Sequence, residues 1–100
     1  MNLILALNGE PTGMVSITAP DADGAVELIS MWVAPEARGR GVGDEAVRQA
    51  ITRAAQRFPN CAMTLSVKTA NRHAIALYQR HGFVDAGLSP DDASEHRMCR

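Results

Sequence analysis

Residues 33–43 read Val33-Ala34-Pro35-Glu36-Ala37-Arg38-Gly39-Arg40-Gly41-Val42-Gly43, and they join an apolar, strand-like run to a long amphipathic segment. The three alternating glycines allow tight turns, and without Cβ atoms they let a ligand approach the backbone closely. Where such a turn opens a helix, several backbone N–H groups lack partners and the helix dipole makes the point electropositive. Arg38 and Arg40 add full positive charges. This stretch therefore predicts a site for a phosphate-bearing ligand at the start of a helix.

The patterns on either side predict a strand, a helix and a second strand. Val26–Val33 is almost continuously apolar after Glu27, as in a strand covered on both faces. From Gly41 to Phe58, apolar and small residues recur at steps of three and four, which is typical of a helix. Ala62–Lys68 then alternates like a strand. Such a unit predicts two parallel strands joined by a right-handed crossover helix.

The rest of the chain predicts antiparallel strands and one more helix. The first twenty residues read as a hairpin, with apolar runs on both sides of the turn-forming residues 8–13. A second turn cluster covers residues 19–24. Residues 71–81 form a helix opened by Asn71 as N-cap and closed by Gly82, and strands follow at 83–88 and 96–99. We therefore predict a single α/β domain over residues 1–100 (α+β in some schemes), with a mixed, mostly antiparallel sheet around the central parallel pair.

Composition excludes several classes of protein. The 100 residues suit one small domain, and the net charge of -1 argues against a general binder of nucleic acid or membrane surfaces. Cys61 and Cys99 have no metal-ligand spacing, so we expect no metal, and free thiols in a reducing compartment, with a disulfide as the alternative. The opening Met1–Leu7 is too short for a signal segment, and no run approaches the length of a membrane span. A cytoplasmic location is expected.

Other interpretations of the glycine stretch fit less well. Gly41–Ala46 matches the dinucleotide fingerprint, but seven residues separate it from Val33 and Asn60 stands where an acidic ribose ligand is needed. A P-loop requires Gly-Lys-Ser/Thr, which is absent from the sequence. A turn that only caps the helix would not need two arginines and three glycines.

Two motifs together suggest a family. Val33-Ala34-Pro35 precedes Arg38-Gly39-Arg40-Gly41-Val42-Gly43, and Asn71 opens a helix that ends in Leu77-Tyr78-Gln79-Arg80-His81-Gly82-Phe83. In these motifs, and in the helix and strand between them, the chain resembles the GNAT superfamily of acyl-CoA-dependent N-acetyltransferases over roughly residues 10–90. The resemblance implies the GNAT acyl-CoA N-acyltransferase fold, with acetyl-CoA as co-substrate and an amine as acceptor.

The resemblance also implies roles for individual residues. Acyl-CoA would lie where the two parallel strands diverge, with its pantetheine arm along the backbone of Met31, Trp32 and Val33. Its pyrophosphate would lie against the N–H groups of Arg38, Gly39, Arg40, Gly41, Val42, Gly43 and Asp44. Asn71 would hydrogen-bond the pantetheine region, and Tyr78 would protonate the departing CoA thiolate. Asn71 and Tyr78 are seven residues apart, which places them on one helix face.

A base is also needed, because an ammonium has no lone pair with which to attack a thioester. Glu27 is the candidate, since it begins a strand that is otherwise apolar, where desolvation raises a carboxyl pKa. The alternative is that Glu27 is a solvated strand-end residue and that a water chain carries the proton. Asp44 would place a negative charge beside the phosphate site unless its side chain points away.

Family members usually begin with a strand and one or two helices ahead of what is Leu3 here. The resemblance therefore identifies a short, N-terminally truncated member whose uncovered apolar sheet surface favours a homodimer. The implied function is transfer of an acetyl group from acetyl-CoA to a primary amine by direct attack on the thioester. The alternative is a non-catalytic acyl-CoA-binding module or sensor with a degenerate acceptor side. In neither case do we expect nucleic acid or a membrane as partner.

Overall fold

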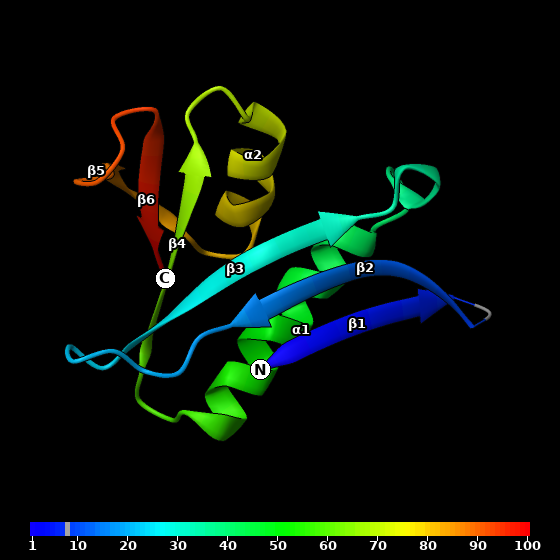
Figure 1. Ribbon diagram of the computed structural model, residues 1–100, viewed down its shortest axis with the longest axis horizontal. Helices are drawn as coiled ribbons and strands as arrows, with labels where there is room; N and C mark the ends of the chain where they lie inside the picture. The colour runs from blue at the N-terminus through cyan, green and yellow to red at the C-terminus, as the bar shows by residue number, and fades with distance from the viewer. Residues whose placement is uncertain (8) are drawn as a thin grey trace.

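A computed structural model describes residues 1–7 and 9–100 of the chain. One sheet of six strands is flanked by two helices (Figure 1). The elements in chain order are β1 (Asn2–Leu7), β2 (Glu10–Ile17), β3 (Ala25–Val33), a 3-10 turn η1 (Pro35–Ala37), α1 (Val42–Arg57), β4 (Ala62–Lys68), α2 (Arg72–Arg80), β5 (Val84–Leu88) and β6 (Glu95–Cys99).

The sheet has the mixed character that the sequence predicts. Its strand order is β1-β2-β3-β4-β6-β5. Only β3 and β4 run parallel, and α1 is the crossover between them, whereas the other neighbours pair antiparallel. The predicted central parallel pair with a crossover helix is therefore confirmed, and both helices start and end within one or two residues of the expected positions.

The turn expected at residues 8–13 is wrong in its extent. Residues 10–13 belong to β2, and Asn8 lies outside the described residues. Two residues of β2, Pro11 and Gly13, pair with Ala6 and Leu5, so Thr12 is an extra residue in a bulge. A bulge accommodates Pro11, which has no N–H to give to a ladder, and the strand thereby extends toward its turn.

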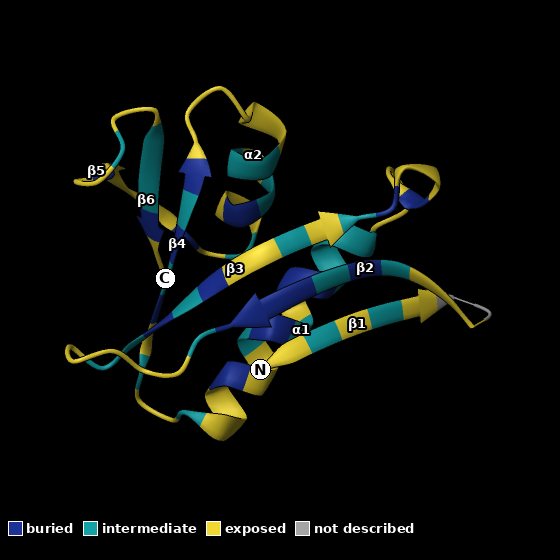
Figure 2. Cartoon of the chain, in the orientation of Figure 1, coloured by how far each residue is buried: buried dark blue, intermediate teal, exposed yellow. Residues whose placement is uncertain are grey.

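The hydrophobic core lies between one face of the sheet and the helices. On α1 the buried positions are Ala46, Val47, Ala50 and Ala54, and their small side chains let the helix lie close to the strands. Alternate residues of the strands meet them, including Val15, Val26 and Leu65. Figure 2 shows this core in dark blue, with exposed positions along the middle of β3 and on β1.

The opposite face of the sheet carries exposed apolar side chains. Ile4 pairs with Met14, and Met14 pairs with Trp32, so the three side chains form one row across β1, β2 and β3. Ile4 is 70% exposed and Trp32 is 45% exposed. We call this side of the sheet the open face.

A bulge in β3 separates two halves of that strand. Between the pairs Ser16–Ile29 and Met14–Trp32, β2 advances two residues while β3 advances three. Ser30 lies in this bulge with a φ of 54°, in the left-handed region that non-glycine residues rarely adopt. The ladder between β3 and β4 ends shortly before this bulge, because it pairs only Ala25–Glu27 with Ala62–Thr64.

Candidate functional site

Beyond Glu27 the two parallel strands part, and their arrows point away from each other in Figure 1. The opening holds a cavity of about 260 Å³, which we call the gap cavity. Its walls come from β3, β4, α2 and the start of β6. The lining residues are Leu28, Ile29, Ser30, Met31, Ser66, Val67, Lys68, Asn71, Ala74, Tyr78 and Glu95.

A larger cavity of about 780 Å³ adjoins the first on the side of the helices, and we call it the helix cavity. It is lined by Met31, Val33, Arg38, Gly39, Gly41, Gly43, Asp44, Asn71, His73, Ala74, Leu77, Tyr78 and Arg80. Four residues line both cavities: Met31, Asn71, Ala74 and Tyr78. The two cavities therefore meet at Tyr78, and together they lead from the start of α1 into the gap between the strands.

The start of α1 presents free backbone donors to the helix cavity. Gly41 is the N-cap residue, and no described side chain caps the helix there. Gly39 and Gly41 both have φ near +80° (78° and 79°), which glycine adopts without the strain that a Cβ would bring. The first N–H groups of a helix have no intrahelical acceptor, so this end can bind an anion.

Gly43 is needed for close packing rather than for its dihedral angles. A Cβ at this position would lie 3.3 Å from Cδ2 of Leu77 and 3.7 Å from Cε of Met31. The first turn of α1 therefore approaches α2 and β3 at the wall of the helix cavity, and a side chain there would force its neighbours to move.

Asp44 is held by α2. Its Oδ1 lies 2.9 Å from Nε2 of His81, and the Arg80 guanidinium donates to both carboxylate oxygens at 3.2–3.3 Å. The hydrogen bond from Arg80, followed by that from His81, lowers the pKa of Asp44 below its ordinary value. Because the Arg80 guanidinium forms an ion pair with it, Asp44 does not leave an unpaired negative charge beside the donors of α1.

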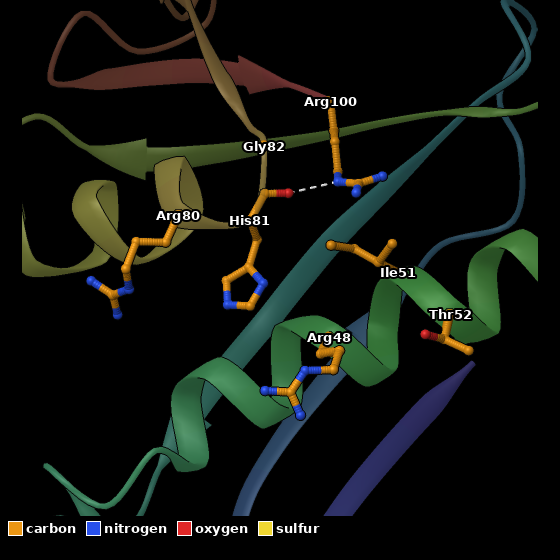
Figure 3. A pocket seen from close by; sticks show the side chains of 7 residues that line it. All are labelled: Arg48, Ile51, Thr52, Arg80, His81, Gly82 and Arg100. Carbon is orange, nitrogen blue, oxygen red and sulfur yellow. Dashed lines mark hydrogen bonds between the residues drawn. The ribbon is translucent and has the colours of Figure 1, made fainter.

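A separate basic hollow of about 400 Å³ is lined in part by Arg80 and His81, the two partners of Asp44 (Figure 3). Arg48 on α1, Arg80 at the end of α2 and Arg100 line it, and the His81 ring lies between the two helices. Nε of Arg100 donates to the carbonyl oxygen of His81 at 2.6 Å. This bond ties the end of α2 to Arg100, and the bonds from Arg80 and His81 to Asp44 tie it to α1. The wall that carries Tyr78 is held in place at this end.

Tyr78 is the buried aromatic residue at the junction of the cavities. It is 7% exposed and packs edge-on against Phe83, with ring centroids 5.9 Å apart. Burial raises the pKa of Tyr78, so the phenol keeps its proton at neutral pH. A protonated phenol can donate to an anion that forms in either cavity.

Asn71 caps α2, as the sequence predicts. Its side-chain oxygen accepts from the N–H of Ala74 at 3.1 Å. This bond leaves the side-chain NH₂ group available as a donor at the junction of the two cavities.

The remaining predicted residues lie elsewhere. Trp32 is on the open face, and Arg40 and Val42 line a fourth cavity, beside β1 and β2. Glu27 is half-buried on the open-face side of β3, at its last ladder pair with Thr64. It is not among the described residues that line the gap or helix cavity.

No local motif in the sequence assigns several of the residues that line or support the site. Ser30, Ser66, Lys68 and Glu95 line the gap cavity, and His81 meets Asp44 across 37 positions of sequence. For Lys68 and Glu95 the order of strands is decisive, because β6 pairs with β4 and places them opposite each other.

Within the described part of the chain, no three His, Cys, Asp or Glu side chains gather closely enough to hold a metal ion. In the same residues no helix is long and apolar enough to span a membrane. Cys61 and Cys99 are both free thiols.

The parallel strands β3 and β4 separate beside the start of their crossover helix α1. The chain has the acyl-CoA N-acyltransferase fold, because its structure matches solved structures with that fold. The chain belongs to the Acetyltransferase (GNAT) family, whose sequence model matches residues 1–83. No curated protein matches the chain by sequence.

Solved structures share the fold over almost the whole chain. An acetyltransferase of the GNAT family from Streptococcus pneumoniae is 27% identical with a TM-score of 0.80, over 99% of this chain and 64% of that one. A putative acyl-CoA N-acyltransferase from Klebsiella pneumoniae is 24% identical with a TM-score of 0.87, over 99% and 70%. The ribosomal-protein-S18-alanine N-acetyltransferase from Escherichia coli is 24% identical with a TM-score of 0.78, over 99% and 65%. The chain thus spans about two thirds of the length of these proteins.

Proposed function

We propose that the protein is an acetyl-CoA-dependent N-acetyltransferase in which a primary amine attacks the thioester directly. One observation carries this proposal: the uncapped start of α1 opens into a cavity that continues, past Asn71 and Tyr78, into the gap between β3 and β4. The pyrophosphate of CoA would lie at the helix start, where N–H groups and the dipole favour an anion. The thioester would then lie near Tyr78.

The part of β3 that follows the Ser30 bulge offers a backbone edge for the pantetheine arm of acetyl-CoA. Met31 and Val33 line the helix cavity, and β4 has left the side of β3 at this point. The pantetheine arm would pair with the backbone around Met31, Trp32 and Val33 as an added strand does. The side chain of Trp32 points to the open face, so only its backbone would contact the cofactor. The side-chain NH₂ of Asn71 would donate to an amide carbonyl of the arm.

Tyr78 would act when the C–S bond breaks. The neutral amine attacks the carbonyl carbon, and the sulfur leaves with the electron pair as a thiolate. Because Tyr78 remains protonated, its hydroxyl would donate to this thiolate. Glu27 lies before the gap rather than in it, so we propose that it accepts the proton of the amine through water.

Calorimetric titration with CoA and acetyl-CoA tests the binding half of the proposal without an assumed acceptor. Turnover of acetyl-CoA is then measured over a panel of primary amines. Tyr78→Phe should lower kcat by about 10²-fold or more while the Kd for CoA changes little, because only the transferred proton is removed. Tight CoA binding with no turnover on any amine would instead identify a binding module, and absence of CoA binding would refute both.

A further inference from the structure

A lysine side chain lines the gap cavity. The sequence has a single lysine, Lys68, at the end of β4. It lines the gap cavity together with Tyr78 and Asn71. The only side-chain amine of the protein therefore belongs to a residue of the gap cavity wall.

Lys68 lies on the face of the sheet opposite the helix cavity, as expected for an acceptor that meets the acetyl group from the other side. Along β4 the residues Met63, Leu65 and Val67 are buried in the core toward the helices, so the alternate residues Ser66 and Lys68 face the other way. The helix cavity lies on the helix side, and the two cavities meet at Tyr78. An acetyl group carried by CoA would approach Tyr78 from the helix side of the sheet. The amine of Lys68 would approach it from the open face.

The amine is held beside the cavity by oxygen atoms of the β5–β6 turn and of Glu95, the first residue of β6. Nζ of Lys68 lies 3.2 Å from Oδ2 of Asp92, 3.2 Å from Oγ of Ser94 and 3.9 Å from Oε2 of Glu95. Asp92 is itself fixed, because its Oδ1 accepts from the backbone N–H and the hydroxyl of Ser94. Glu95 also lines the gap cavity and stands opposite Lys68 in the β4–β6 ladder.

We propose that Lys68 is an internal acceptor, and that the protein acetylates this residue within its own chain. The inference rests on the proposed use of acetyl-CoA. The Lys68 ammonium first gives a proton to Glu95 or water, and its lone pair then attacks the thioester carbonyl carbon. A C–N bond forms, the C–S bond breaks, and the thiolate takes a proton from Tyr78, which regains one from the amine nitrogen through water. The products are N-acetyl-Lys68, free CoA and one proton released to solvent.

Acetylation would change the gap cavity. It removes the positive charge that balances Asp92 and Glu95 and adds an acetyl group to a small cavity. The modified protein would therefore present two carboxylates without their lysine partner beside the gap cavity.

The test uses the full chain and acetyl-CoA labelled in the acetyl group, with peptide mapping by mass spectrometry to locate the label. We expect label at Lys68, a first-order rate constant that does not change with protein concentration, and a decrease of about 10²-fold in Tyr78→Phe. The side chain of Lys68 is 59% exposed, so uncatalysed acetylation must be measured separately. The matched control is the double variant Lys68→Arg with Arg53→Lys, which also has one lysine but places it on an exposed position of α1.

Labelling of the control at the rate of the wild type would overturn the inference, as would a rate constant that rises in proportion to protein concentration. Titration of the wild type with free CoA separates the two proposals. If CoA binds and Lys68 stays unlabelled, self-acetylation is refuted, and turnover over the panel of amines then decides the proposed function. If CoA does not bind, the proposed function fails and the inference fails with it.

Discussion

Replacement of Gly41 by alanine isolates the contribution of the glycine turn, because the added methyl group meets no other atom within 4 Å. The cost is therefore conformational. Gly41 has a φ of 79°, and an L-residue with a Cβ pays about 1–2 kcal/mol in the left-handed region. For a domain of this size, each kcal/mol lowers Tm by about 4–8 °C. Gly41→Ala should thus melt roughly 4–16 °C below the wild type.

The same substitution should also weaken CoA binding. Gly41 is the N-cap of α1, so any relaxation of its strain turns the first N–H groups of the helix away from the helix cavity. Loss of one hydrogen bond to a charged group costs about 1.5–3 kcal/mol, which is roughly a ten- to hundredfold increase in Kd.

Gly24→Ala is the matched control. Gly24 has a φ of 74°, a Cβ there also meets nothing within 4 Å, and it lies in the turn at the opposite end of β3 (Figure 1). Both variants should lose similar stability by thermal denaturation followed by circular dichroism, but only Gly41→Ala should lose CoA affinity by calorimetry. Equal affinity in the two variants would refute the assignment of the pyrophosphate to the start of α1. An unchanged Tm in Gly41→Ala would refute the need for glycine.

Two further outcomes are expected. The hydrogen bonds from Arg80 and then from His81 lower the pKa of Asp44 in the folded protein. Its carboxylate therefore stabilises the fold at a pH above the unfolded pKa near 3.8, and this stabilisation is lost as the pH falls through the lower, folded pKa. Urea unfolding of Asp44→Asn should therefore show a deficit at pH 7 that shrinks below pH 3.8, and a deficit independent of pH would contradict this explanation. The homodimer remains a prediction, which rests on the exposed apolar side chains of the open face, with Trp32 45% exposed. In analytical ultracentrifugation the wild type should sediment as a dimer and Trp32→Glu as a monomer. A wild type that is monomeric at high concentration would contradict the prediction.

The order and type of the elements could be predicted from the sequence because local patterns determine them. The apolar positions of α1 recur at helical spacing, and β4 alternates over all seven of its residues. Asn71 was identifiable as an N-cap because its side chain bonds a backbone group only three residues away. The free N–H groups at the start of α1 could be predicted as well, because they depend only on the local glycine stretch before the helix.

Features that depend on pairing between distant strands could not be predicted. Residues 10–13 have turn-forming side chains, yet they extend β2 because β1 lies on one side and Val33 pairs with Gly13 on the other. Lys68 reaches Glu95 only because β6 lies between β4 and β5, an order that no local pattern specifies. The roles of Tyr78 and Glu27 in catalysis stay predictions until turnover is measured.

The bulge at Ser30 explains how one strand contributes both to the core and to the site. Val26 and Leu28 face the helices, and uninterrupted alternation would bring Trp32 to that side and turn Met31 and Val33 to the open face. One extra residue reverses this, so that Met31 and Val33 line the helix cavity while Trp32 pairs with Met14 on the open face. A non-glycine residue held in this conformation costs about 1–3 kcal/mol, and it persists because the pairs on both sides of the bulge are fixed by packing. Since the ladder to β4 ends just before the bulge, the extra residue at Ser30 and the opening of the gap cavity belong to one change in the path of β3.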